Sequence, residues 1–156
     1  MDAKRLIQTL SFGLSEGGNV VALGLDVVFI PRIAESLRSF GERFEERMFT
    51  PSEIAYARSA PAQQAERLAA RFAAKEAVIK ALSLSDTGLD WRDIELVRNE
   101  DGSCAIALHG TAAHALAARG GDRAIVSLSH DGEYAAAVVA VLSDTKHGGC
   151  DEKSGA

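Results

Sequence analysis

A carboxylate inside an apolar strand is the first sign of chemistry in this chain. Asp26 lies within residues 20–28, a stretch that is otherwise apolar except for Gly24. An ionised carboxylate in such surroundings costs several kcal/mol unless a cation or hydrogen-bond donors compensate its charge. Two interpretations are open: Asp26 serves a cation, or it is a strand-end residue that accepts hydrogen bonds from nearby backbone amides.

A charged face on a helix is the second sign. Phe72, Glu76 and Lys80 are four residues apart and therefore share one helical face, while Arg71 and Lys75 line an adjacent one. A Glu and a Lys at this spacing usually form a solvated salt bridge worth a few tenths of a kcal/mol. The apolar Phe72 on the same face favours a partly buried site instead.

A histidine beside a tight turn is the third sign. His130 ends an alternating strand and is followed by Asp131, although a lone histidine there is more often structural than catalytic. Residues 127–132 are not a hydrolase nucleophile elbow, because Gly-x-Ser-x-Gly is missing. The chain also lacks a Walker loop and a Gly-x-Gly-x-x-Gly motif. His109 and His114 do not have the i, i+4 spacing of a helical zinc site.

A small α+β domain is needed to bring these residues together. Pro31 favours a helix to about residue 40, and Thr50, Pro51 and Glu53 have the spacing of a capping box that starts another. The longest helix is predicted over residues 63–82, which contain no Gly or Pro. We expect hairpins from strands 94–97 with 104–108 and 124–130 with 133–142, separated by a short helix at 111–119. This order is typical of α+β proteins.

Composition narrows the class of protein. The chain has 156 residues, 47% of them hydrophobic, and a net charge of -5. General nucleic-acid binding or attachment to an anionic membrane is therefore not expected. No apolar run reaches the roughly 20 residues that span a bilayer. The start lacks the pattern of a signal peptide, and Cys104 and Cys150 lack metal or redox spacing, so we expect a cytoplasmic protein. We divide the chain into an extension (1–19), one domain (20–142) and a disordered tail (143–156).

Several segments, in this order, resemble the holo-acyl-carrier-protein synthases, which are single-lobe phosphopantetheinyl transferases. The resemblance covers about residues 20–142 and rests on 24–33 (GLDVVFIPRI), 49–53 (FTPSE), 67–82 (RLAARFAAKEAVIKAL), 93–96 (DIEL) and 126–131 (VSLSHD). The third segment is the most diagnostic. Residues 83–88 (SLSDTG) depart from the family's usual Gly-containing loop. The resemblance implies an antiparallel sheet packed against a long central helix, with shorter helices around it.

The resemblance also implies a reaction. The 4'-phosphopantetheine of coenzyme A would move to a serine of an apo acyl carrier protein, releasing adenosine 3',5'-bisphosphate. Asp26 and Glu76 would bind Mg²⁺ together with the pyrophosphate, in line with the preference of Mg²⁺ for carboxylate and phosphate oxygens. Lys80 and His130 would act at the phosphates, with Asp131 as an assisting carboxylate. Glu76, Asp131, His130 and a metal-bound water remain alternatives for the general base.

Further contacts are expected from the same resemblance. Arg71 and Lys75 would join Lys80 and His130 in binding coenzyme A. A single-lobe chain implies a homotrimer with active sites at the subunit interfaces.

The acidic carrier protein needs a local basic surface, because this chain is acidic as well. We expect it around Arg32 and Arg38, followed by Arg43 and Arg47. The glutamates interleaved with these arginines also allow an ordinary mixed surface.

Two rival functions remain. The first is a Mg²⁺-dependent phosphohydrolase that would use Asp26 and Glu76 with water as the acceptor. The second is a non-catalytic carrier-binding module, which predicts loss of Asp26, Glu76 or Lys80. All three residues are present.

Overall fold

A three-stranded antiparallel sheet forms the frame of the domain. The computed structural model describes residues 19–144. Within them, β1 (Asn19–Phe29), β5 (Tyr134–Ser143) and β4 (Arg123–Asp131) pair in the order β1-β5-β4. Asp26 pairs with Ala137 of β5, which in turn pairs with Leu128 of β4. The central β5 is buried along almost its whole length, in keeping with its Ala- and Val-rich sequence.

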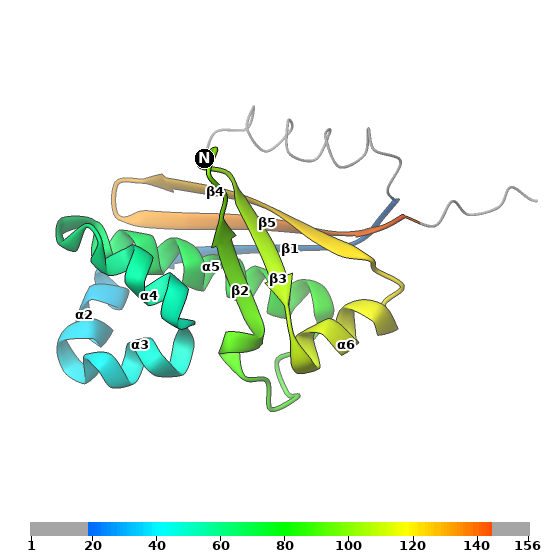
Figure 1. Cartoon of the computed structure of the whole chain (residues 1–156), viewed down its shortest axis with the longest axis horizontal. Coiled ribbons are helices and arrows are strands. Elements are labelled where there is room, and N and C mark those ends of the chain that lie inside the picture. Colours follow the sequence, from blue (N-terminus) through cyan, green and yellow to red (C-terminus); the bar gives the residue numbers. More distant parts are fainter. Residues whose placement is uncertain (1–18, 145–156) are drawn as a thin grey trace, which may run out of the picture.

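The long helix α5 (Gln64–Leu82) packs against this sheet (Figure 1). Its fully buried alanines allow the close approach, and so does Gly24 of β1. A Cβ atom added to Gly24 would lie 1.8 Å from the carbonyl oxygen of Ala77. The missing side chain thus sets the distance between β1 and α5, and with it the distance between Asp26 and Glu76.

Three short helices connect β1 to α5. They are α2 (Ile30–Phe40), α3 (Glu42–Met48) and α4 (Pro51–Arg58), followed by the 3-10 turn Pro61–Gln63. The predicted capping box is present: Thr50 N donates to Glu53 Oε2 at 2.9 Å, and Glu53 N to Thr50 Oγ1 at 3.4 Å. Helix α3 was not expected from the sequence. Gly41, at φ +52°, separates it from α2.

A second, two-stranded sheet runs across the first (Figure 1). It consists of β2 (Ile94–Arg98) and β3 (Cys104–Leu108), is preceded by the 3-10 turn Trp91–Asp93 and leads into α6 (Gly110–Ala118). Trp91 stacks on Phe72 of α5 with ring centroids 5.1 Å apart. This contact helps to hold the hairpin against the long helix.

The expected α+β class and the sheet packed against a long central helix are confirmed. One turn differs from the prediction. Asp131 pairs with Tyr134, so the loop between β4 and β5 is Gly132 and Glu133 rather than Asp131 and Gly132. Almost all of the predicted extension and tail lies outside the described residues. None of the helices within residues 19–144 is long and apolar enough to span a bilayer.

Candidate active site

Asp26 and Lys80 form an ion pair between β1 and α5. Lys80 Nζ lies 2.7 Å from Asp26 Oδ1 and also donates to the carbonyl oxygen of Leu25 at 3.1 Å. The Asp26 side chain is only 15% exposed, whereas Lys80 is half exposed. The compensating partner of the carboxylate is therefore a cation from another element, not the local amides of the alternative interpretation.

Glu76 lines the same cleft as Asp26, one helical turn before Lys80. Burial, and then the negative charge of Asp26, raises the pKa of Glu76 above its ordinary value, while Lys80 opposes this shift. No ion pair between Glu76 and Lys80 is found within residues 19–144, so the alternative of a solvated i, i+4 salt bridge does not hold, and Lys80 pairs with Asp26 instead. Glu76 is thus a half-buried carboxylate with an unfavourable negative neighbour.

The positions of Asp26 and Glu76 suit a divalent cation that is bound by these two carboxylates together with oxygen atoms of a substrate. Asp26 and Glu76 line a cleft of about 360 Å³ together with Phe72 and Arg32. No group of three or more metal-ligating side chains occurs in the described part of the chain. Mg²⁺ does not require one, because it commonly takes one or two carboxylates and completes its shell with phosphate oxygens and waters. The charge repulsion that raises the pKa of Glu76 is what such an ion would relieve.

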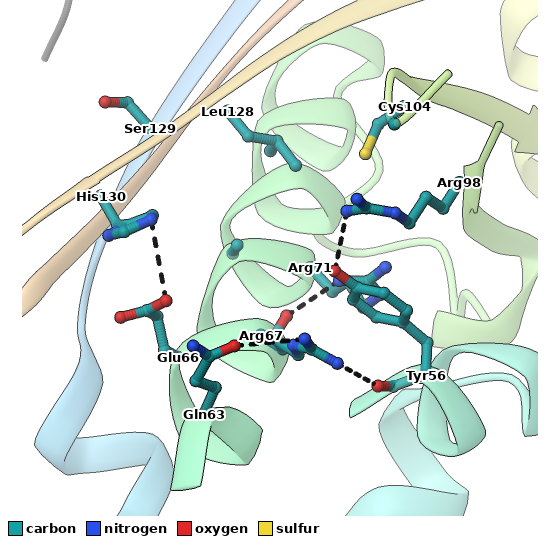
Figure 2. A pocket seen from close by; sticks show the side chains of 12 residues that line it. Tyr56, Gln63, Glu66, Arg67, Arg71, Arg98, Cys104, Leu128, Ser129 and His130 are labelled. Atoms are coloured by element: carbon teal, nitrogen blue, oxygen red, sulfur yellow. Dashed lines mark hydrogen bonds and ion pairs between the residues drawn. The ribbon is translucent and has the colours of Figure 1, made fainter. Parts of the chain in front are cut away.

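A second, basic cavity of about 430 Å³ lies at the N-terminal half of α5 (Figure 2). It is lined by Tyr56 of α4, Arg67 and Arg71 of α5, Arg98 of β2 and His130 of β4, among others. Arg71 is only 4% exposed, and its Nε has no hydrogen-bond partner. Guanidinium groups bind phosphate well, so the cavity is suited to a phosphorylated ligand.

Three of these residues were not expected from the sequence: Tyr56, Arg67 and Arg98. They come from separate elements, and no motif links them. The one available signal was the i, i+4 spacing of Arg67 and Arg71, which places both on one helical face.

His130 belongs to the basic cavity and not to the cleft of Asp26 and Glu76. Its Nε2 lies 3.7 Å from Glu66 Oε1, and the adjacent Asp131 is exposed. At 3.6 residues per turn, the side chains of Arg71 and Glu76 leave α5 in directions about 140° apart around the helix axis. Within one chain, the two halves of the predicted site therefore lie on different sides of α5.

The burial of Lys75 contradicts the expectation that this side chain contacts coenzyme A. Its side chain is fully buried, with Nζ 2.9 Å from Glu53 Oε2. It also donates to the carbonyl oxygens of Trp91, at 3.0 Å, and Ile94. Burial lowers the pKa of Lys75, and the charge of Glu53 opposes that shift. A side chain with these three partners and no exposed surface is structural.

The expected carrier-docking arginines lie on the surface of α2 and α3. Arg32 is exposed and faces the cleft that contains Asp26 and Glu76. Arg38 is paired with Glu35 at 2.5 Å. Arg43 and Arg47 line a third cavity, of about 450 Å³, with Phe40 and Phe44. Exposed glutamates, Glu35, Glu42 and Glu46, lie among these arginines, so the surface is mixed in charge with an apolar part at Phe40.

Fold and site together define a phosphate-handling α+β enzyme, and comparison with known proteins identifies its family. Residues 22–139 match the sequence profile of the 4'-phosphopantetheinyl transferase superfamily, and the chain belongs to that family. The resemblance seen in the sequence is thereby confirmed.

Individual relatives agree with this assignment. The chain is 44% identical to a holo-[acyl-carrier-protein] synthase of Koribacter versatilis, over 80% of this chain and 99% of the relative. It is similar to the solved Chronobacterium ammoniagenes ACPS-CoA complex, with 36% identity, a TM-score of 0.67 and coverage of 80% of this chain and 98% of that one. It also resembles the Helicobacter pylori holo-[acyl-carrier-protein] synthase in complex with coenzyme A, with 31% identity, a TM-score of 0.66 and coverage of 78% and 99%.

Proposed function

We propose that this chain is a Mg²⁺-dependent holo-acyl-carrier-protein synthase. It transfers 4'-phosphopantetheine from coenzyme A to a serine of an apo acyl carrier protein and releases adenosine 3',5'-bisphosphate. This proposal rests on one observation: the side chains of Asp26, Glu76 and Lys80 lie close together between β1 and α5. Coenzyme A as the donor is supported by the relatives whose structures were solved with it.

The chemistry is an in-line transfer in which positioning and charge stabilisation dominate. The serine oxygen attacks the β-phosphorus, the bond from that phosphorus to the bridging oxygen breaks, and the bisphosphate leaves with the bridging oxygen. Mg²⁺ held by Asp26 and Glu76 would neutralise the pyrophosphate. Lys80 turns from Asp26 to the leaving bisphosphate, and His130 contacts the phosphates. The serine proton passes to a base, for which Glu76, His130 and Asp131 are the candidates.

A homotrimer with sites at its interfaces is supported by the division of the site within one chain. Asp26 and Glu76 line one cleft and His130 lines another, so a complete site needs halves from two subunits. The outer face of β1 supports this arrangement. It exposes Leu23 (60%) and Val27 (55%) in an apolar stripe. A stripe of this kind on a small domain is typical of a protein interface.

The carrier protein would dock on α2 and α3. Arg32, Arg43 and Arg47 supply positive charge, and Phe40, 64% exposed, supplies apolar surface beside them. Such a surface suits an acidic partner that also presents apolar side chains. Arg38 contributes less, because Glu35 already neutralises it. A cytoplasmic location stays a prediction, consistent with the free thiol of Cys104.

Two substitutions test the proposed metal site. Asp26→Asn and Glu76→Gln should each lower turnover by at least about a hundredfold at saturating coenzyme A, the usual order for loss of a charge-stabilising group. Glu100→Gln, at the exposed tip of the β2–β3 loop, is the matched control and should keep wild-type turnover. Near-normal turnover of either site variant at saturating Mg²⁺ would refute the metal assignment.

A further inference from the structure

Lys80 covers an oxygen of one of the two carboxylates in the cleft between β1 and α5. Its Nζ lies 2.7 Å from Asp26 Oδ1 and donates to the carbonyl oxygen of Leu25 at 3.1 Å. Two oxygens of one strand segment thus hold the ammonium group in place. An ammonium group and a divalent cation compete for such oxygens, because both are positive and both bind carboxylates.

Close backbone packing fixes the distance between the elements that carry this pair. A Cβ atom on Gly24, two residues before Asp26, would lie 1.8 Å from the carbonyl oxygen of Ala77 and 3.1 Å from the backbone nitrogen of Ala81. Only a glycine allows a strand to lie so close to a helix backbone. Because β1 and α5 are held together in this way, the pair separates most easily through rotation of the long Lys80 side chain.

The Lys80 side chain has room for this rotation. It is 53% exposed, whereas the Asp26 side chain is 15% exposed. An ion pair with an exposed partner contributes little free energy, since solvent screens the charges and the long side chain loses entropy when it is held. The ammonium group can therefore exchange Asp26 for a more strongly charged anion that enters the cleft.

Glu76, the second carboxylate of the cleft, forms no ion pair within residues 19–144. Burial, and then the charge of Asp26, raises the pKa of Glu76, and the charge of Lys80 opposes this shift. Arg32 lines the same cleft, but it is exposed and pairs with neither carboxylate in that part of the chain. Lys80 is therefore the cation that offsets the negative charge which a metal ion would meet there.

We propose that Lys80 keeps divalent cations out of the cleft of Asp26 and Glu76 until coenzyme A binds. This inference rests on the proposed function. The pyrophosphate of coenzyme A draws the ammonium group away from Asp26, and the uncovered carboxylate then binds the metal together with Glu76 and phosphate oxygens. Metal and coenzyme A therefore bind cooperatively. By thermodynamic linkage, each raises the affinity for the other by the same factor.

Metal binding in the absence of turnover tests this role. Mn²⁺, which prefers the same oxygen ligands as Mg²⁺, is titrated with the protein and the free ion is measured by electron paramagnetic resonance. The titration is made without carrier protein, and with or without saturating coenzyme A. Lys80→Met and Lys80→Gln remove the positive charge, and Lys80→Arg keeps it. Arg32→Gln is the matched control, because it removes another positive charge from the same cleft. Thermal unfolding without metal verifies that each variant is folded.

The expected result is a gain of metal affinity on loss of the lysine charge. The wild type should bind Mn²⁺ at least about tenfold more tightly with coenzyme A than without it, a usual size for coupling between two ligands. Without coenzyme A, Lys80→Met and Lys80→Gln should bind Mn²⁺ at least about tenfold more tightly than the wild type. Lys80→Arg and Arg32→Gln should stay within about threefold of the wild type. Adding Asp26→Asn to Lys80→Met should abolish the gain.

Two results would overturn the proposal and leave the transferase function intact. The first is that Lys80→Met and Lys80→Gln bind Mn²⁺ without coenzyme A as weakly as the wild type, while the wild type with coenzyme A binds it tightly. The second is an equal gain in Arg32→Gln, which would assign the effect to the overall charge of the cleft. A folded wild type that binds coenzyme A but no Mn²⁺ would instead refute the metal site of the proposed function.

Discussion

Removing the buried ammonium of Lys75 should destabilise the domain without changing its substrate affinity. Lys75 and Glu53 are both fully buried and lie 2.9 Å apart. Glu53 also accepts hydrogen bonds from Thr50 N and Leu96 N, each at 2.9 Å. Lys75→Met fills a similar volume but leaves the carboxylate without its cation. Breaking a buried pair in this way costs about 3–5 kcal/mol.

That cost is large against the roughly 5–15 kcal/mol that typically stabilises a domain. Urea unfolding measures it directly, as a lower midpoint at an unchanged slope. The matched control is Arg92→Gln, which breaks the exposed pair with Asp90 and should cost less than about 1 kcal/mol. In the double variant Glu53→Gln/Lys75→Met, part of the loss should be recovered, because no unpaired charge stays buried.

The opposite pattern would refute this reasoning. If Lys75→Met unfolds at the wild-type urea midpoint but has a much higher KM for coenzyme A, Lys75 contacts the ligand, as the sequence predicted. A loss below about 1 kcal/mol would show that the carboxylate is not left as an uncompensated buried charge.

Three further perturbations probe other parts of the molecule. Gly24→Ala places a Cβ 1.8 Å from the Ala77 oxygen and should cost about 1–3 kcal/mol in urea unfolding and lower turnover; wild-type stability would contradict the close approach. The side-chain hydrogen bond from Arg92 is the main cause that lowers the pKa of Asp90 from 3.8 to about 2. The resulting stability is present above about pH 4 and is lost as the pH falls through about 2. Asp90→Asn should therefore be less stable than wild type by under about 1 kcal/mol near neutral pH, and this difference should vanish below about pH 2. Arg32→Glu should weaken binding to the carrier protein, in a direct binding assay, far more than binding to coenzyme A; equal effects would exclude docking at α2.

The fold could be predicted because its signals are local. The capping box at Thr50 and Glu53, the Gly- and Pro-free stretch of α5 and the alternating strands each depend on residues close together in the chain. The extra helix α3 was missed because Gly41 indicates only that α2 ends, and the short charged segment after it has no capping side chain to mark a new helix.

The site could be predicted only in part, because its contacts join distant segments. Helical spacing put Lys80 beside Glu76, yet its ion pair is with Asp26, on a strand that lies far away in sequence. Lys75 looked like a ligand because it is charged and belongs to the same motif, whereas its buried partner Glu53 is visible only in three dimensions. Tyr56 carried no signal in sequence, because the arginines that its ring contacts come from α5 and β2.

The most direct test of the central claim is intact-mass spectrometry of an apo acyl carrier protein incubated with this protein, coenzyme A and Mg²⁺. A Mg²⁺-dependent transferase predicts a mass gain equal to one phosphopantetheine on the carrier, abolished by EDTA and restored by added Mg²⁺. A folded protein that binds coenzyme A but leaves several carriers unmodified would contradict that claim. Release of nucleotide products without any change in the carrier would favour a phosphohydrolase instead.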